Sequence, residues 1–182
     1  MINFIEDSDP GYRHRTYINA GADFTLAIAA DFTTAGEKLT ESCVRDQHKL
    51  LHQVNISSGL DLNVNMIEKI VTKLNRISHL TNVKMNIAGN GIYTLNRRGF
   101  SYSQQQLDHF VFLFLKAILN HPDLKTQIIE VVTGGQTGID EAGAKAADKL
   151  GYKTSIVAPK GWRFRGLNGD IIDEQLFKNR FS

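Results

Sequence analysis

The sequence has few of the residues that reinforce small or unusual proteins. Its 182 residues include one cysteine, Cys43, which excludes an intramolecular disulfide and a cluster of thiolate metal ligands. Three prolines and 22% charged residues describe neither a proline-rich linker nor a disordered chain. A compact chain of this length buries roughly 70% of its extended surface, so it needs no covalent reinforcement. We expect one domain over residues 1–182, with Cys43 as a buried, inert thiol in a helix.

Strong charge of one sign and long hydrophobic runs are also lacking. The formal net charge is +2, which gives no reason to expect nonspecific binding to nucleic acid or to a membrane. The most apolar window, Phe110 to Leu119, is about half as long as a membrane span and contains Lys116. The first residues, Met1 to Asp7, show no basic segment followed by a long apolar run, unlike a signal peptide. We predict a cytoplasmic protein that does not contact membranes.

Histidine is present, but in no arrangement typical of a metal site. The six histidines are scattered, and none has the spacing of a His-Glu-x-x-His motif or a similar one. We therefore predict that the protein has no metal site and requires no cofactor.

Strand-like and helix-like segments alternate along the chain. Helical spacing of apolar residues is clearest in 103–120, behind a capping box at Ser103 and Gln106, and it recurs in 67–77, in 139–150 and from Ala35 onward. This alternation predicts right-handed crossovers and an α/β, three-layer Rossmann-like fold, with a mainly parallel sheet of about five strands flanked by helices. Nearly continuous apolar runs predict the strands at 23–30, 51–56, 83–88, 128–132 and 154–158. Two segments, 94–102 and 161–182, are expected to be irregular.

The strongest functional signal is a glycine-rich turn between the predicted strand at 128–132 and the helix that follows it. Glycines let a backbone approach a ligand closely, and free N–H groups at a helix start attract anions. A dinucleotide fingerprint would need glycine at Thr133, and a P-loop would need Gly-Lys-Ser/Thr, so a dehydrogenase and an ATPase are disfavoured. The alternative is a plain turn with Thr137 as N-cap and Asp140 as its partner at the third helical position. We predict a phosphate-bearing, nucleotide-like ligand, bound here by Gly134, Gly135, Gln136, Thr137, Gly138 and Asp140.

Two further loops follow predicted strands, where ligands bind in open parallel sheets. The loop after Ala88 offers backbone amides and the ring of Tyr93, or is a plain turn with that ring packed inward. The loop after Ala158 offers cations for a phosphate and Trp162 for stacking, or is a solvated basic loop with the indole as a packing anchor. The candidate ligand-binding residues of these two loops are Gly89, Asn90, Gly91, Tyr93, Lys160 and Arg163.

The loop after the first predicted strand opens a helix and offers an anion site at Thr33, Thr34 and Gly36. Thr34 and Glu37 have the spacing of a capping box, in which the carboxylate binds a backbone N–H. A carboxylate serving as general base or nucleophile would compete with a phosphate there, so we favour structural capping for Glu37. If the protein is an enzyme, its candidate catalytic residues are Asp140 and Glu37.

These loops resemble the SLOG superfamily of Rossmann-like nucleotide-ligand proteins, and most of all its molybdenum cofactor carrier branch. Residues 134–140 and 158–161 are similar to that branch's Gly-Gly-Gln-Thr-Gly-x-Asp helix start and Pro-Lys-Gly loop. Residues 15–26 and 36–40 resemble its Arg-Thr-x-x-Asn…Asp-x-Thr-Leu strand and the following helix start, whereas 41–86 show no likeness. The blocks stand in the opposite order, as after a circular permutation, which nearby chain ends tolerate. The resemblance implies a bound nucleotide-derived or pterin-phosphate ligand.

The superfamily also contains phosphoribohydrolases with a Pro-Gly-Gly-x-Gly-Thr-x-x-Glu motif. Thr40 stands where their catalytic glutamate would be, and a hydroxyl cannot replace that charge at an oxocarbenium-like centre. The sequence therefore favours a carrier, sensor or sequestering protein over an enzyme. The first alternative is a hydrolase of a nucleotide N-glycosidic or phosphate bond. The second, a single-stranded nucleic-acid binder, is disfavoured by near-zero net charge and the lack of a basic-aromatic stripe.

Two residues widen the apolar face of the 103–120 helix beyond a single stripe, namely Phe112 and Leu113. Either both sides of this helix are buried within the domain, or one side packs against a second subunit. Because superfamily relatives are often dimers, the resemblance implies a homodimer.

Overall fold

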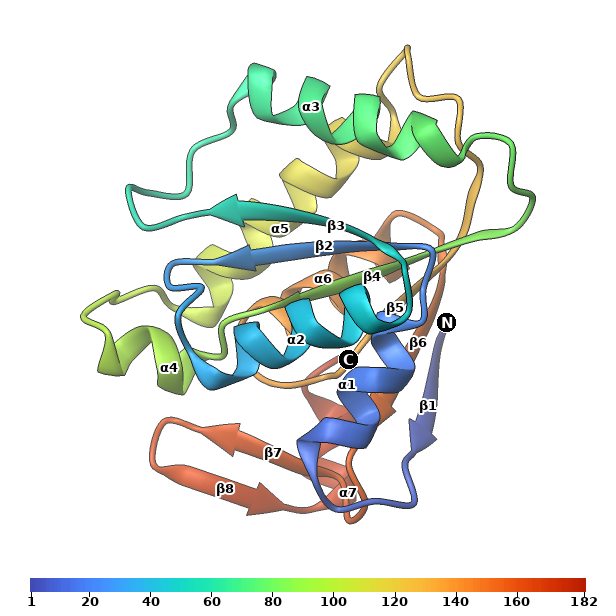
Figure 1. Ribbon diagram of the computed structural model, residues 1–182. Helices are drawn as coiled ribbons and strands as arrows, with labels where there is room; N and C mark the ends of the chain where they lie inside the picture. Colours follow the sequence, from blue (N-terminus) through green and yellow to red (C-terminus); the bar gives the residue numbers. More distant parts are fainter.

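Six parallel strands form the central sheet of the computed structural model, which describes residues 1–182 (Figure 1). Both faces of the sheet are covered, and all six residues of its strand Phe24–Ala29 are buried. This burial explains the continuous apolar runs, since a strand covered on both faces needs no polar alternation. The predicted three-layer, Rossmann-like α/β fold is confirmed, with six strands in the sheet. In sheet order the strands are β1 (Ile2–Glu6), β6 (Lys153–Ala158), β5 (Ile128–Thr133), β4 (Val83–Gly89), β2 (Phe24–Ala29) and β3 (Leu50–Asn55).

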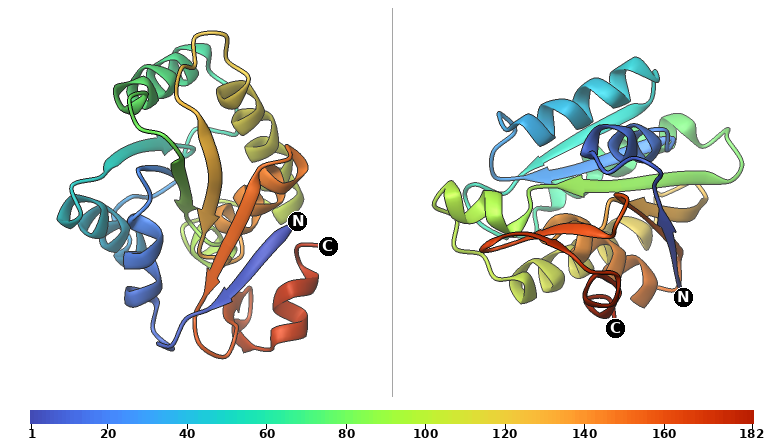
Figure 2. Two further views of the ribbon diagram at one scale, coloured as in Figure 1. Left: turned by 90° about the vertical axis from the view of Figure 1, so that its right-hand side faces the viewer. Right: turned by 90° about the horizontal axis from the view of Figure 1, so that it is seen from below.

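Helices form the two outer layers (Figures 1 and 2). On one face, α1 (Tyr12–Ala20) packs against α2 (Ala35–Asp46). The other face carries α3 (Val64–Leu74), α5 (Gln104–Leu119) and α6 (Ile139–Lys149). The shorter elements are the 3-10 turn η1 (Asn75–Ile77), α4 (Ile92–Arg97), α7 (Glu174–Asn179) and the antiparallel hairpin of β7 (Arg163–Gly166) and β8 (Gly169–Ile172).

The largest hydrophobic core lies between the sheet and the α3, α5 and α6 layer. Phe110 and Phe114 of α5 stack there, with ring centroids 5.5 Å apart. The predicted capping box is confirmed, because Ser103 and Gln106 each accept a hydrogen bond from the other's backbone N–H. Cys43 is buried in α2 beside Val44, as expected. No helix has the length and apolar character needed to span a membrane.

The two segments expected to be irregular contain regular structure. Residues 94–97 belong to α4, and residues 161–182 contain β7, β8 and α7. These elements have four to six residues each, too few to show a clear periodicity. The tail is held by contacts between distant parts of the chain: the ring of Phe177 lies 6.5 Å from that of Phe4 and 5.9 Å from that of Phe164. Strand β1, also not apparent from the sequence pattern, pairs with β6 at the sheet edge.

The order of the strands creates a crevice at one edge of the sheet. Strand β2 leads into α2 on one face, whereas its neighbour β4 and the next strand β5 lead to α5 and α6 on the opposite face (Figure 2). The loops that leave β2 and β4 therefore diverge. In open α/β sheets, such a switch point beyond the carboxyl ends of the strands is where ligands bind.

Candidate ligand-binding site

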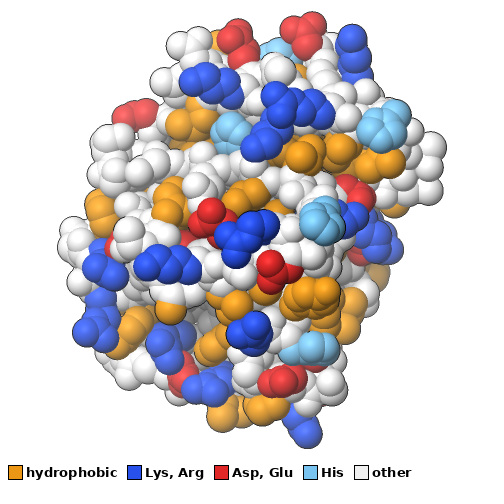
Figure 3. Space-filling model, in the orientation of Figure 1, with side chains coloured by type: hydrophobic (Ala, Val, Ile, Leu, Met, Phe, Trp, Pro, Cys, Tyr) orange, Lys and Arg blue, Asp and Glu red, His pale blue; other side chains and the backbone are white.

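A cleft of about 520 Å³ opens at this switch point. It is lined by one side of α1, the start of α2, the loop after β4, the glycine-rich loop after β5, and Arg165 from the β7–β8 hairpin. Figure 3 views this face, where Lys and Arg side chains gather around a hollow below α2. The cleft therefore brings together three of the four loops that the sequence singles out, together with a helix that it does not predict.

Most of the predicted ligand-binding residues line the cleft. From the first two loops these are Thr34, Gly36, Gly89, Asn90, Gly91 and Tyr93. From the glycine-rich loop they are Gly134, Gln136, Thr137 and Asp140. Glu37, one of the two candidate catalytic residues, lines it as well, so both candidates face the same space. Whether these residues touch a ligand stays a prediction.

Two glycines of the glycine-rich loop serve the fold and do not line the cleft. Gly135 has φ +67°, and a Cβ atom there would lie 2.5 Å from Ile156. Gly138 has φ +90°, and a Cβ atom would lie 2.4 Å from the carbonyl oxygen of Asn90. A side chain therefore fits at neither position, because the positive φ disfavours it and the Cβ atom would clash with side chains at Gly135 and with backbone at Gly138. The expectation that these two glycines face the ligand is not met in this geometry.

The glycine-rich loop is also bound by the protein's own side chains. The N–H of Gly138 donates to Gln104 Oε1 at 2.7 Å, and the N–H of Gln136 donates to Asp140 Oδ2 at 3.4 Å. The Thr137 hydroxyl donates to the carbonyl of Arg165 at 2.6 Å, so Thr137 does not cap α6, whose N-cap is Gly138. The alternative turn with Thr137 as N-cap is wrong. Much of the hydrogen-bonding capacity at this helix start is thus already used.

A buried ion pair joins α1 to the start of α6. Arg15 Nη1 lies 3.5 Å from Asp140 Oδ2 and donates to the carbonyl of Gly134, and both side chains are 9% exposed. Burial raises the pKa of the Asp140 carboxyl, and Arg15 opposes this by favouring the charged form. A guanidinium does not lose its proton in proteins, so Asp140 is the countercharge that its burial requires.

Glu37 does not perform the capping role that we favoured for it. The first half of the box forms, because Thr34 Oγ1 accepts from the N–H of Glu37 at 3.3 Å. The carboxyl group, however, turns into the cleft, where Oε1 accepts from Asn90 Nδ2 at 3.1 Å. The residue is only 6% exposed, and its Oε2 is buried without a partner. Burial, and next the negative charge of Asp140, raise the pKa of Glu37 to about 8.

The cleft is marked by buried polar atoms that lack a hydrogen-bond partner. The whole chain has seven such side-chain atoms, and five belong to residues that line this cleft. Buried polar groups in folded proteins nearly always have a partner, so a concentration of unpartnered ones indicates a place that a ligand or solvent fills. The five atoms are Tyr12 Oη, Arg15 Nε, Asn19 Oδ1, Glu37 Oε2 and Asn86 Oδ1.

Besides Gly135 and Gly138, three predicted ligand-binding residues lie outside the cleft, namely Thr33, Lys160 and Arg163. The N–H and hydroxyl of Thr33 both donate to Asp31 Oδ1, at 2.7 and 2.6 Å, in a local turn. Lys160 is exposed and does not line the cleft, and Arg163 is bound by Asp170. Trp162 packs as an anchor instead of stacking on a ligand, with its ring 5.6 Å from that of Phe177. Thr33 and Arg163 thus bind side chains of the protein, whereas Lys160 is exposed away from the cleft.

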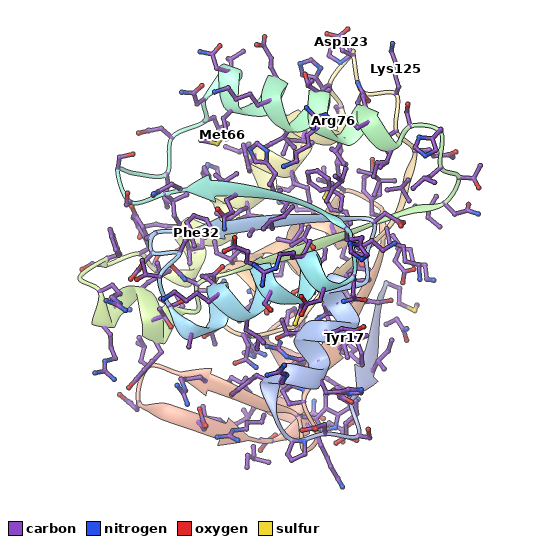
Figure 4. All side chains as sticks on the ribbon, viewed as in Figure 1. Tyr17, Phe32, Met66, Arg76, Asp123 and Lys125 are labelled. Atoms are coloured by element: carbon purple, nitrogen blue, oxygen red, sulfur yellow. The ribbon has the colours of Figure 1, made fainter.

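The residues of α1 are the main part of the cleft that sequence reasoning missed. Arg15, Thr16 and Asn19 line it, whereas Tyr17 does not and is 49% exposed (Figure 4). Residues 15–19 were already marked by their resemblance to the carrier family. No helix was predicted there, however, so the direction of their side chains could not be inferred. Asn86 carried a second signal, because a polar residue between the apolar Met85 and Ile87 of a predicted strand, here only 2% exposed, needs a partner.

The far end of the sheet shows no comparable site. Asp123 and Lys125 lie there beside Arg76 (Figure 4), and the backbone carbonyl of Asp123 and N–H of Lys125 bind the side chain of Asn75. No group of three or more His, Cys, Asp or Glu side chains is arranged to hold a metal ion. Comparison of the chain with protein-family models, curated proteins and solved structures yields no match.

Proposed function

We propose that this cleft binds a small phosphate-bearing ligand of nucleotide or pterin-phosphate type, and that the protein carries, senses or sequesters it. The observation that carries the proposal is the set of five unpartnered buried polar atoms around a cleft of about 520 Å³. Pockets for small molecules typically measure about 300–1,000 Å³ and use a few placed polar groups to orient the ligand. The position at the switch point of a parallel sheet supports the same reading.

The start of α2 is the best place in the cleft for the phosphate. Helix starts present free N–H groups and a partial positive charge. Gly36 lies in the first turn with open space around it, because a Cβ atom there would meet nothing within 4 Å. Arg165, 45% exposed, adds a cation at the same cleft. The objection that Glu37 would repel a phosphate weakens, since a carboxyl group with a pKa of about 8 is mostly neutral at pH 7.

Native mass spectrometry of freshly purified protein, followed by denaturing extraction, tests this proposal. We expect a co-purified nucleotide or pterin phosphate. The variant Gly36→Asp should lose it, because a carboxylate at the start of α2 repels the phosphate. Thr72→Asp, which places the same charge on the exposed side of α3, is the matched control and should retain the ligand. A phosphate ligand retained equally by both variants would argue against this location.

A hydrolase of a nucleotide N-glycosidic or phosphate bond is the second candidate function. It is favoured by the two carboxyl groups that the cleft brings together, of which Asp140 is held by Arg15 and Glu37 has a pKa near 8. Such a pair can divide acid and base roles. Thr40 does not join this pair, because it has no carboxyl group, and its hydroxyl donates to the carbonyl of Gly36 at 3.1 Å. Release of base or phosphate from a nucleotide panel would favour this function over simple binding.

The resemblance to the molybdenum cofactor carrier branch also gains a spatial argument. Its two sequence blocks stand far apart and in reversed order, yet Arg15 and Asp140, one from each block, form the buried ion pair of the cleft. The chain ends lie on the same side of the molecule, with the rings of Phe4 and Phe181 5.8 Å apart (Figure 2). Both observations support the proposal that this chain is a circularly permuted relative. A circular permutation needs chain ends that lie close together, and it keeps the residues of a site in contact.

The homodimer stays a proposal. Leu113 lies in an apolar groove with Leu60, Leu62 and Phe110, which is the surface of α5 that a second subunit would cover. Phe112 needs no such partner, because Lys149 lies 4.4 Å from its ring centre. A monomeric mass by light scattering at micromolar concentration would refute the dimer.

A further inference from the structure

The carboxyl group of Glu37 is held in one orientation by a chain of hydrogen bonds. Asn90 Oδ1 accepts from the backbone N–H groups of Ala30 and Asp31, at 3.0 and 3.1 Å. The amide nitrogen of Asn90 must therefore point the other way, where it donates to Glu37 Oε1 at 3.1 Å. Because Oε1 accepts this hydrogen bond, a proton on the carboxyl group belongs on Oε2. That atom is buried and has no hydrogen-bond partner, and Glu37 is one of the residues that line the cleft.

The surroundings of Glu37 favour its neutral form. Burial is the main cause, and the negative charges of Asp140, on α6, and Asp31, in the loop after β2, act in the same direction, whereas the hydrogen bond from Asn90 opposes them. The cations are committed elsewhere: Arg15 lies 3.5 Å from Asp140, and Arg98 lies 3.0 Å from Asp31. The remaining titratable or charged groups that line the cleft are Tyr12, Tyr93 and Arg165. No cation pairs with the Glu37 carboxyl.

We propose that Glu37 determines ligand specificity, by donating a hydrogen bond from its protonated Oε2 to an unprotonated ring nitrogen or carbonyl oxygen of the ligand. This inference rests on the proposed function and deepens it. A ligand with an N–H at this position would face the Oε2 proton and bind poorly, since a buried donor without an acceptor is costly. The cleft thus recognises two features of the ligand: its phosphate at the start of α2, and an acceptor atom with a free lone pair at Glu37.

Two variants separate this hydrogen bond from other roles of Glu37. Glu37→Gln keeps the acceptor for Asn90 and puts an amide N–H in place of the Oε2 proton, and an amide does not titrate. Glu37→Leu has similar size but can neither accept nor donate. Thermal unfolding of both variants checks that the fold is retained.

The experiment is calorimetric titration of AMP, GMP, CMP and UMP into the wild type and both variants, between pH 7 and pH 9. For a nucleotide that binds, we expect the wild-type Kd to rise about tenfold from pH 7 to pH 9, since only the protonated form binds. Glu37→Gln should bind about as tightly as the wild type at pH 7, and its own Kd should change less than about twofold between pH 7 and pH 9, because an amide does not titrate. Any pH dependence that remains in Glu37→Gln comes from the nucleotide and the other groups of the cleft, so dividing the wild-type Kd by that of Glu37→Gln removes it. Glu37→Leu should bind at least about tenfold more weakly at every pH.

The outcomes are distinguishable. If no nucleotide binds the wild type at pH 7, the proposed function fails for nucleotides, and this inference fails with it. If a nucleotide binds but Glu37→Gln is as weak as Glu37→Leu, the inference alone is overturned. It is also overturned if wild-type affinity, relative to that of Glu37→Gln, is constant or increases with pH, because the carboxylate would then be the binding form.

Discussion

The guanidinium of Arg15 donates a hydrogen bond to the carbonyl of Gly134, which lies 119 residues later in the chain. The close approach requires a glycine at that position, because a Cβ atom on Gly134 would lie 1.8 Å from Arg15 Nη1 and 2.6 Å from Asp140 Oδ2. Gly134 therefore makes room for the buried ion pair rather than for the ligand alone. Its place in the motif follows from the packing of α1 against the loop after β5.

Replacing Gly134 by alanine should disrupt this arrangement. The new methyl group must displace Arg15 from Asp140, which leaves a buried charge without its partner. We expect the free energy of unfolding to fall by about 3 kcal/mol or more, the usual effect of breaking a buried ion pair. Urea denaturation monitored by circular dichroism measures the change.

Gly36→Ala is the matched control for Gly134→Ala. A Cβ atom at Gly36 meets nothing within 4 Å, and alanine is favoured over glycine in a helix. This variant should be as stable as the wild type, or more stable by up to about 1 kcal/mol. Equal stability of the two variants would show that Arg15 relaxes away from the loop at little cost.

The alternation of strands and helices was predictable, because each long element leaves a periodic apolar pattern of its own. Strands β2, β4, β5 and β6 are mostly buried, so their apolar runs are visible without knowledge of their neighbours. By contrast, β1, α7 and the β7–β8 hairpin have four to six residues and depend on contacts across the chain, such as that of Phe4 with Phe177. No local sequence pattern predicts such contacts.

The cleft was partly predictable for the same reason. The loops after β2, β4 and β5 follow buried strands, and parallel strands place those loops at one edge of the sheet. What could not be predicted is the direction of individual side chains. Glu37 has capping-box spacing, yet Asn90 draws its carboxyl into the cleft; Thr137 could cap α6, yet its hydroxyl binds Arg165. In both cases a hydrogen bond with a residue distant in sequence forms in place of the local capping hydrogen bond.

Gln136 should matter for the hairpin more than for the fold as a whole. Its side-chain amide donates to the carbonyl of Arg163 at 3.0 Å, and its oxygen accepts from the N–H of Arg165 at 3.1 Å. We expect Gln136→Leu to cost about 1–2 kcal/mol, the net value of two hydrogen bonds. Amide hydrogen exchange should accelerate at Arg165, whereas exchange in the central strands should change only as far as global stability falls.

Gln175→Leu serves as the control for that variant. Gln175 is exposed on α7, and its side chain donates a hydrogen bond to Asn179, one turn along the same helix. Its replacement should leave exchange at Arg165 unchanged. If Gln136→Leu also leaves that exchange unchanged, the ion pairs of Asp170 with the two hairpin arginines suffice to hold β7 in place.

The raised pKa of Glu37 has a consequence for stability that does not depend on any ligand. In the unfolded chain this carboxyl releases its proton near the ordinary value of 4.5, whereas in the folded protein it does so at about 8. Between these values the folded state holds one proton more than the unfolded state, so its stability decreases as pH rises. Each pH unit in this window costs up to 1.36 kcal/mol, or at most about 4 kcal/mol between pH 5 and pH 8.

Glu37→Gln isolates this contribution, because the amide does not titrate while the other ionisable groups remain. The free energy of unfolding of the wild type, minus that of Glu37→Gln, should decrease by a few kcal/mol from pH 5 to pH 8 and level off above about pH 8. Urea denaturation at half-unit pH intervals gives this difference directly. Parallel curves would mean that Glu37 ionises near its ordinary pKa, and the cleft would then contain a carboxylate at neutral pH. In that case a phosphate at the start of α2 would lie beside a carboxylate, and Arg165, which is already paired with Asp170, would be the one cation left in the cleft to offset their repulsion. The choice of that helix start as the phosphate site would then have to be abandoned.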